Sequence, residues 1–76
     1  MIRDGLRKVI GKNNVFDSSG FGNGFPDLVC YHNGLKLLEI KMKGEKLTPK
    51  EVEFAKYFPT YKVETLEQAI SALMKG

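Results

Sequence analysis

The amino-acid sequence predicts a single α/β domain whose elements follow the order α-β-β-β-α-β-α. Three observations lead to this prediction. Apolar residues near the N-terminus repeat with the period of a helix, and an Asn33-Gly34 pair separates two apolar segments, as in a β-hairpin. Two helix-capping patterns, in residues 48–51 and 65–68, then open helices farther along the chain. No repeat, linker or low-complexity segment divides the chain, so we expect one domain over residues 1–76.

The first half of the chain is expected to form a helix over residues 2–10, a strand beginning at residue 15, a glycine-rich loop over 18–24 and two strands over 27–31 and 35–42. The helix follows from one apolar stripe, made of Ile2, Leu6, Val9 and Ile10. Gly11 then ends it. The loop contains three glycines within five positions, a composition that disfavours regular structure.

The register of the hairpin decides which side chains share a face. A two-residue turn would place Asp27 and Glu39 on opposite faces of the sheet. A three-residue loop over 32–34, with its glycine in the left-handed conformation of a G1 bulge, instead pairs Tyr31 with Leu35. Counting back from that pair sets Asp27 opposite Glu39. We predict the three-residue loop.

The second half begins with a capping box. Thr48 is a favourable N-cap, Pro49 suits the first helical position, and Glu51 occupies the position that completes the box. The expected elements are a helix ending at residue 57 before Phe58-Pro59, a strand over 61–63 and a final helix over 66–73.

Length and composition exclude several classes of protein. A chain of 76 residues buries only about 60–65% of its unfolded surface, so its stability is marginal. One cysteine excludes an internal disulfide, and one histidine beside it excludes a Cys/His zinc site, which leaves dimerisation as support. No apolar run approaches a membrane span and the N-terminus lacks a secretory h-region, so we expect a cytoplasmic protein with no membrane partner.

The net charge of +3 is concentrated in one segment. Residues 41–50 contain four lysines and one glutamate, which together equal the charge of the whole chain. A clustered basic segment suits a polyanion, although an ordinary solvated loop has the same composition. We therefore predict that Lys43, Lys46 and Lys50 contact the phosphates of such a polyanion.

The residues best suited to metal binding or catalysis are Asp27, Glu39 and Lys41. Glu39 and Lys41 lie two apart in the most apolar strand, so their side chains share a face. One interpretation is a Glu39–Lys41 ion pair on a solvated sheet. With Asp27 opposite Glu39, however, two carboxylates become neighbours and need a cation between them. Hard oxygen ligands of this kind suit Mg²⁺ or Mn²⁺, and an adjacent ammonium would complete a unit for phosphodiester hydrolysis.

The glycine-rich loop is predicted to be a flap over this site. Within it, Ser18 and Ser19 are candidates for hydrogen bonds to a phosphate. Asp17 is either a further acid near the site or a turn residue. Cys30 alternates with apolar residues and is predicted to be a core residue, not a nucleophile.

At these positions the chain resembles the PD-(D/E)XK nuclease superfamily, and most of all the small stand-alone VRR-Nuc proteins, many of them phage-encoded. The likeness covers about residues 16–73. It is carried by Asp-Ser-Ser at 17–19, the glycine-rich segment 20–24, Phe-Pro-Asp-Leu-Val at 25–29, Leu-Glu-Ile-Lys at 38–41 and Leu-Thr-Pro at 47–49. It implies a restriction-endonuclease-like fold, with a central mixed sheet flanked by helices and an extra C-terminal helix.

The resemblance also implies roles for individual residues. Asp27 and Glu39 would bind Mg²⁺, with Mn²⁺ able to substitute, the backbone carbonyl of Ile40 would be a further ligand, and Lys41 would be the catalytic lysine. Two positions depart from the family. Glu51 stands where relatives usually carry Gln, and is either a helix cap or part of the metal shell. Only Asp4 is available as the acid of the first helix, where it could equally be a favourable first-turn charge.

The function implied is that of a metal-dependent DNA endonuclease, a homodimer selective for branched DNA or four-way junctions, in a bacterial or phage-infected cell. No small-molecule cofactor is expected. Two alternatives remain open from the residues alone. One is a non-catalytic DNA-binding or assembly module with the same fold, and the other is an ion-paired α/β domain without a nucleic-acid role.

Overall fold

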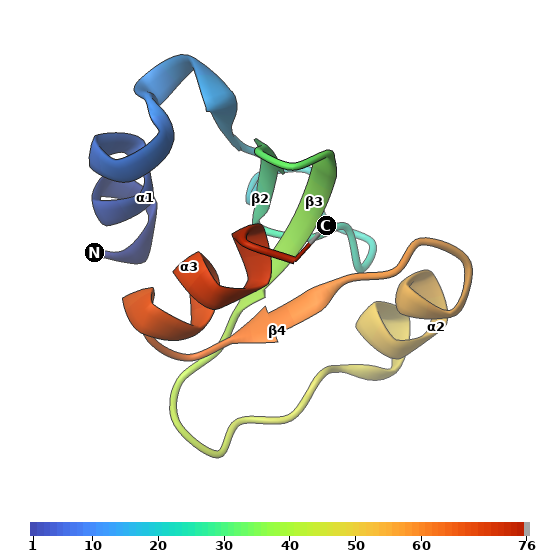
Figure 1. The fold of residues 1–76 in the computed structure, drawn as a ribbon. Coiled ribbons are helices and arrows are strands. Elements are labelled where there is room, and N and C mark those ends of the chain that lie inside the picture. The colour runs from blue at the N-terminus through green and yellow to red at the C-terminus, as the bar shows by residue number, and fades with distance from the viewer. Residues whose placement is uncertain (76) are drawn as a thin grey trace.

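The computed structural model describes residues 1–75 and contains a four-stranded mixed sheet with three α-helices (Figure 1). The elements are α1 Ile2–Ile10, β1 Val15–Asp17, β2 Leu28–Tyr31, β3 Leu35–Ile40, α2 Pro49–Tyr57, β4 Tyr61–Val63 and α3 Leu66–Leu73. A 3₁₀ turn, Lys12–Asn14, joins α1 to β1 and was not predicted. The predicted α/β class and element order are confirmed. No helix within the described residues is long and apolar enough to cross a membrane.

The strands lie in the order β1-β2-β3-β4, with β4 parallel to β3 and the other neighbours antiparallel. In the hairpin Tyr31 pairs with Leu35, and Leu28 pairs with Leu38. The three-residue loop is therefore confirmed. Its second and third residues both have positive φ, 54° at Asn33 and 99° at Gly34, where the sequence had predicted a left-handed residue only at the glycine. Asparagine tolerates this conformation better than most residues.

Polar side chains fix the hairpin tip. The buried Lys36 ammonium donates to the carbonyl oxygens of His32 at 3.0 Å and Asn33 at 2.8 Å. The Asn33 amide in turn donates to the carbonyl of Leu73, at the end of α3, at 3.3 Å. These contacts satisfy a buried charge and hold the loop against the last helix.

The core lies between the sheet and the pair α1 and α3, which pack side by side on one face (Figure 1). It consists of Leu6, Val15, Leu28, Cys30, Leu38, Val63, Ala69, Ala72 and Leu73. Burial raises the pKa of the Cys30 thiol to about 11, in agreement with its prediction as a core residue. Because strand side chains alternate, the residues next to Leu38 in β3, Leu37 and Glu39, point to the opposite face.

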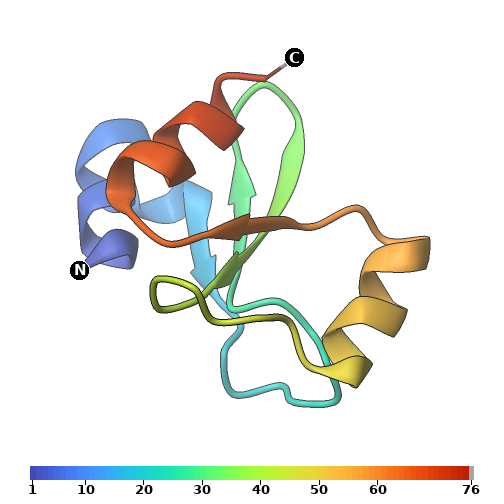
Figure 2. The ribbon, with the colours of Figure 1, turned by 90° about the horizontal axis from the view of Figure 1, so that it is seen from below.

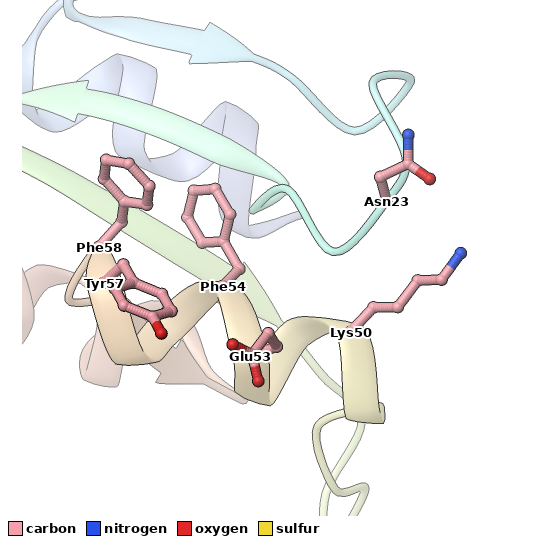
Figure 3. A pocket seen from close by; sticks show the side chains of 6 residues that line it. All are labelled: Asn23, Lys50, Glu53, Phe54, Tyr57 and Phe58. Atoms are coloured by element: carbon pink, nitrogen blue, oxygen red, sulfur yellow. The ribbon is translucent and has the colours of Figure 1, made fainter.

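Helix α2 lies apart from the other two helices, beside the glycine-rich loop (Figure 2). The rings of Phe25, from the loop, and Phe54 meet at 5.2 Å between centroids. Phe54 and Phe58 stack at 4.9 Å and line an open pocket of about 310 Å³ on α2 (Figure 3). At Gly24 the loop backbone comes so close to α2 that a Cβ atom would overlap the Lys50 carbonyl.

The two central strands are shorter than predicted. β2 begins at Leu28 instead of Asp27, because the Asp27 side chain, and not its backbone, meets β3. β3 ends at Ile40 instead of Met42, because the Met42 N–H donates to Glu45 Oε1 at 2.9 Å in a turn that includes Gly44 at φ 78°. The site residues therefore lie just where the regular sheet ends.

The contact at Gly24 yields a prediction about stability. Gly24→Ala combines a strained φ of +83° with a clash against the backbone of Lys50, so we expect it to lower the free energy of unfolding by about 2 kcal/mol or more. Gly22→Ala is the matched control, because Gly22 has a φ of +74° but open space around its Cβ position. Urea denaturation measures both. Equal losses in the two variants would show that close packing at Gly24 contributes nothing.

Candidate active site

Asp27 lies where the glycine-rich loop enters β2, and its carboxylate is directed at β3. Asp27 Oδ2 accepts a hydrogen bond from the Ile40 N–H at 2.9 Å. The backbone at this junction is held by Ser18, whose N–H donates to the Asp27 carbonyl at 2.8 Å and whose hydroxyl donates to the Pro26 carbonyl at 2.7 Å. The Asp27 carboxylate is thus positioned by its hydrogen bond from Ile40 and by the hydrogen bonds with which Ser18 holds the backbone of Pro26 and Asp27.

Glu39 meets Asp27 on the face of the sheet opposite α1 and α3. Its side chain is nearly buried, with 4% exposed. Burial, a hydrogen bond with the Asp27 carboxyl, and the charges of Asp27 and Glu51 raise the pKa of Glu39 to about 8. The prediction that these two carboxyl groups are neighbours is confirmed. Such a pair must share a proton or bind a cation.

Lys41 follows Glu39 on the same face but does not pair with it. The Lys41 ammonium, 8% exposed, lies 2.8 Å from Glu51 Oε1 and 3.9 Å from Glu45 Oε2. Its backbone N–H donates to the Val63 carbonyl, which continues the contact with β4. The hydrogen bond to Glu51 raises the pKa of Lys41, so the group is charged at neutral pH. The interpretation as a Glu39–Lys41 ion pair is therefore wrong.

Glu51 closes the predicted capping box of α2. Its Oε1 accepts the Thr48 N–H at 2.8 Å, and its own N–H donates to the Thr48 hydroxyl at 3.2 Å. Burial alone would raise the pKa of Glu51, but the Lys41 ammonium and the Thr48 N–H hold it below its ordinary value. The capping role is confirmed, and the oxygen that caps the helix also pairs with Lys41. A place for Glu51 in a metal shell stays a prediction.

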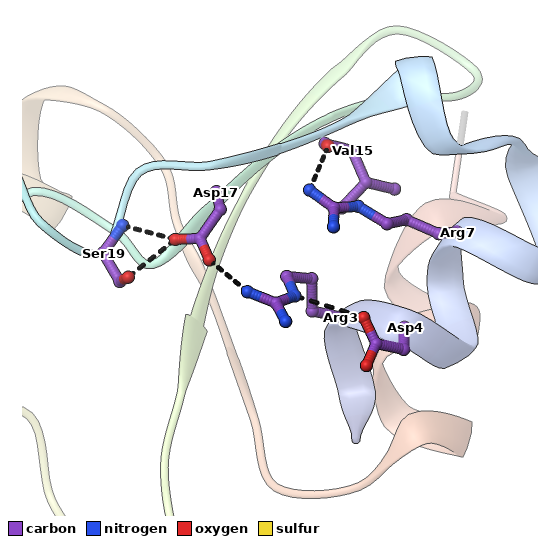
Figure 4. Close-up of polar contacts among 6 residues, drawn as sticks. All are labelled: Arg3, Asp4, Arg7, Val15, Asp17 and Ser19. Carbon is purple, nitrogen blue, oxygen red and sulfur yellow. Dashed lines mark hydrogen bonds and ion pairs between the residues drawn. The ribbon is translucent and has the colours of Figure 1, made fainter.

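The acidic residues near α1 form a separate network (Figure 4). Arg3 donates from Nη1 to Asp17 Oδ2 at 2.7 Å and from Nε to Asp4 Oδ1 at 3.3 Å. Asp17 also accepts the N–H and hydroxyl of Ser19, so it is a turn residue, and these bonds hold its pKa far below the ordinary range. Asp4 is exposed and pairs with Arg3, and its place in the first turn of α1 suits a favourable helix charge. Its role as a metal ligand stays a prediction.

The two serines of the loop have different surroundings. Ser18 is fully buried and its hydroxyl is bonded to Pro26, so the predicted phosphate contact is wrong for this residue. It serves instead to close the base of the loop. Ser19 is exposed and its hydroxyl donates to Asp17 Oδ1 at 2.6 Å. A phosphate contact by Ser19 stays a prediction.

A cleft of about 330 Å³ opens beside Asp27. Its lining consists of Met1, Arg3, Asp17, Ser19, Asp27, Leu28 and Ile40. Arg3 is the residue that sequence reasoning missed here, since nothing in the spacing of residues 3 and 27 indicates that α1 reaches the start of β2. The cleft thus places a guanidinium beside a carboxylate of the candidate site.

The carboxyl pair meets the requirements of a small hard cation. Mg²⁺ binds few protein groups and keeps several waters, so two carboxylates and one carbonyl suffice. A metal ion here would be held by Asp27, Glu39 and backbone oxygen. Because a residue in an antiparallel ladder offers its N–H and C=O to the same side, the Ile40 carbonyl is directed to the edge where its N–H meets Asp27.

The three lysines predicted to contact DNA are all exposed. Lys43, Lys46 and Lys50 form no ion pair with a carboxylate in the part of the chain that the structure describes. Lys43 and Lys46 belong to the segment between Lys41 and α2, and Lys50 lies in the first turn of α2. Their positive charge follows Lys41 in the chain and is exposed to a polyanion.

Comparisons of the chain with known protein families, with characterised proteins and with solved structures found no match.

The Glu39 carboxyl makes stability depend on pH. Its pKa in the folded chain, about 8, lies above the value of about 4.3 expected when unfolded, so between these values the folded state binds more protons. Without metal, stability falls as pH rises from about 5 to 8, by at most about 1.4 kcal/mol per pH unit. Glu39→Gln should flatten this slope and be more stable than wild type at pH 8. Urea denaturation in EDTA at several pH values measures it, and stability that rises over this range in wild type would contradict the prediction.

Proposed function

We propose that this protein is a metal-dependent endonuclease that hydrolyses DNA phosphodiester bonds on a restriction-endonuclease-like fold of the VRR-Nuc kind. The single observation that carries the proposal is the contact between the Asp27 and Glu39 carboxyl groups at the end of the sheet. Keeping a buried carboxyl group in contact with a second, half-buried one is unfavourable unless something positive binds there. Lys41, on the same face, supplies the ammonium that phosphoryl chemistry needs.

Each residue of the site has a distinct role in this proposal. Asp27, Glu39 and the Ile40 carbonyl would hold Mg²⁺, with Mn²⁺ as a substitute. When bound, the ion polarises the phosphoryl group and lowers the pKa of a water. Lys41 donates a hydrogen bond to a phosphate oxygen and stabilises the negative charge that grows there in the transition state.

The DNA contacts are proposed to be contacts to phosphates. Lys43, Lys46 and Lys50 are exposed beside the site, and such contacts position a backbone without reading sequence. The three helices and four strands leave no further element to enter a groove. Selection of a DNA structure, such as a branch or four-way junction, is accordingly favoured over selection of a sequence.

The open face of the sheet supports a homodimer. Phe16, Tyr31 and Leu35 lie opposite α1 and α3, and each is more than half exposed. Half-buried Val29 and Leu37 extend the same apolar surface. An apolar face of this extent on so short a chain is typical of an interface, and a two-fold axis would bring two sites to one DNA molecule.

A cleavage assay tests the activity. Wild type should cut branched DNA in Mg²⁺ or Mn²⁺ but not in EDTA, while Glu39→Ala and Lys41→Ala should lose activity by about 100-fold or more because each removes part of the reacting centre. Lys8→Ala, which removes an exposed lysine of α1, is the matched control and should retain activity. Single-stranded, duplex, flapped and four-way DNA are compared.

The same assay separates the alternatives. Salt-sensitive DNA binding by wild type without metal-dependent cleavage would favour the non-catalytic module. Absence of any DNA binding would favour a plain ion-paired domain.

Light scattering tests the dimer. Wild type should have twice the mass of the chain, and Leu35→Glu should be monomeric, because a charge on the open face is buried without a partner in the dimer. Leu35 is 67% exposed, so this change does not disturb the core. Val9→Glu alters a residue of α1 that is 50% exposed and should leave the mass unchanged. A monomeric wild type would contradict the proposal.

A further inference from the structure

The contact between Lys41 and Glu51 joins the candidate site to the start of α2. Glu51 Oε1 lies 2.8 Å from the Lys41 ammonium and 2.8 Å from the Thr48 nitrogen. One carboxylate oxygen thus accepts from the capped helix end and from the buried lysine together. The helix cap fixes this oxygen in space, and the oxygen fixes the ammonium.

We propose that Glu51 is a positioning residue that holds the Lys41 side chain in its reactive orientation, so that the N-terminal turn of α2 governs the site. The claim that this orientation matters for catalysis rests on the proposed nuclease activity. The claim that Glu51 holds the Lys41 side chain in place does not, and it is tested without DNA.

The neighbouring Glu45 shows why Glu51 is assigned this role. Both glutamates accept a backbone N–H three residues earlier, Glu45 from Met42 and Glu51 from Thr48, each through Oε1. Glu45 Oε2, however, is 3.9 Å from Lys41, beyond hydrogen-bond distance, and its side chain is half exposed. Glu51 is mostly buried and bonds to Lys41 directly, so its hold on the ammonium is less weakened by solvent.

The first turn of α2 is itself fixed from another side. The glycine-rich loop lies against the Lys50 carbonyl at Gly24, next to Glu51 in the chain. Asp27 stands at the end of that same loop. The turn that carries Glu51 is therefore packed against the segment that carries a proposed metal ligand, and this couples the position of Lys41 to that of Asp27.

Three variants separate positioning from helix capping. Glu51→Ala removes the oxygen that accepts the Thr48 N–H and pairs with Lys41. Glu45→Ala makes the same chemical change at the neighbouring turn. Thr48→Ala weakens the cap by removing its hydroxyl, but it keeps both Glu51 and the Thr48 N–H that fixes the Glu51 oxygen.

The first measurement is acetylation of lysines by an amine reagent, followed by mass spectrometry of the intact folded chain. Glu51→Ala should raise the modification rate of Lys41 about tenfold relative to exposed Lys43, because the ammonium is released from its partner. Glu45→Ala should change it by less than about twofold. Lys36, buried at the hairpin, reports general unfolding. Unchanged protection of Lys41 in Glu51→Ala would overturn the inference whether or not the protein is a nuclease.

The second measurement is the kinetics of DNA cleavage. Glu51→Ala should lower kcat about tenfold or more with KM within about twofold, since misplacement of a reacting group affects the transition state more than DNA binding. Glu45→Ala and Thr48→Ala should keep kcat near wild type below their melting temperatures, because both retain the Thr48 N–H and the Glu51 carboxylate that hold Lys41. Equal kcat for wild type and Glu51→Ala would overturn the proposed effect on catalysis. If wild type does not cleave DNA while Lys41 is released in Glu51→Ala, the nuclease proposal fails and the positioning role of Glu51 stands.

Discussion

The arrangement of the candidate site depends on the register of the β2–β3 hairpin. Tyr31 pairs with Leu35, and from that pair every cross-strand neighbour back to Leu28 and Leu38 is set. Shifting the register by one residue would turn each side chain of one strand to the other face, and the Asp27 carboxyl would lose both Ile40 and Glu39. Two left-handed residues at the tip, Asn33 and Gly34, make the three-residue loop possible. A backbone conformation at one end of the hairpin thus determines the chemistry at the other.

The site concentrates charge where a sheet would ordinarily be apolar. Glu39 and Lys41 are both nearly buried, and neither neutralises the other. Lys41 is compensated by Glu51, whereas Glu39 forms no ion pair within residues 1–75, and its burial beside Asp27 raises its pKa. The ammonium therefore has a full partner and the carboxyl pair does not. A bound cation would supply the positive charge that the carboxyl pair lacks.

Much of this arrangement was predictable, because local signals determine it. The Asn33-Gly34 pair indicates the hairpin, counting along two strands sets Asp27 beside Glu39, and Thr48 with Glu51 forms the cap that was expected. What the sequence did not reveal are contacts between segments joined by irregular loops. Nothing in the spacing of Lys41 and Glu51 indicates an ion pair, since the turn between them has no fixed period.

Burial of Ser18 was unforeseen for the same reason. A serine in a glycine-rich loop is ordinarily exposed, and only the path of the loop, which brings Ser18 back to Pro26 and Asp27, turns its hydroxyl inward. Arg3 reaches the cleft at Asp27 because α1 packs across β1, a tertiary contact without a local signal. Side-chain placement in irregular segments thus follows from packing, which residue type alone does not predict.

Two buried lysines, Lys36 in β3 and Lys41 just after it, have different kinds of partner, and this difference distinguishes a structural role from a chemical one. Lys36 is satisfied by two carbonyl oxygens of its own hairpin, which are neutral and fixed by the loop backbone. Lys41 is held by a carboxylate from another element, close to two further carboxyl groups. Backbone carbonyls can only hold an ammonium in place. A charged partner on a separate helix can also share that ammonium with an incoming phosphate, because the phosphate competes for the same hydrogens with a similar charge. Geometry alone therefore makes Lys36 a structural residue and Lys41 the one suited to act on a substrate.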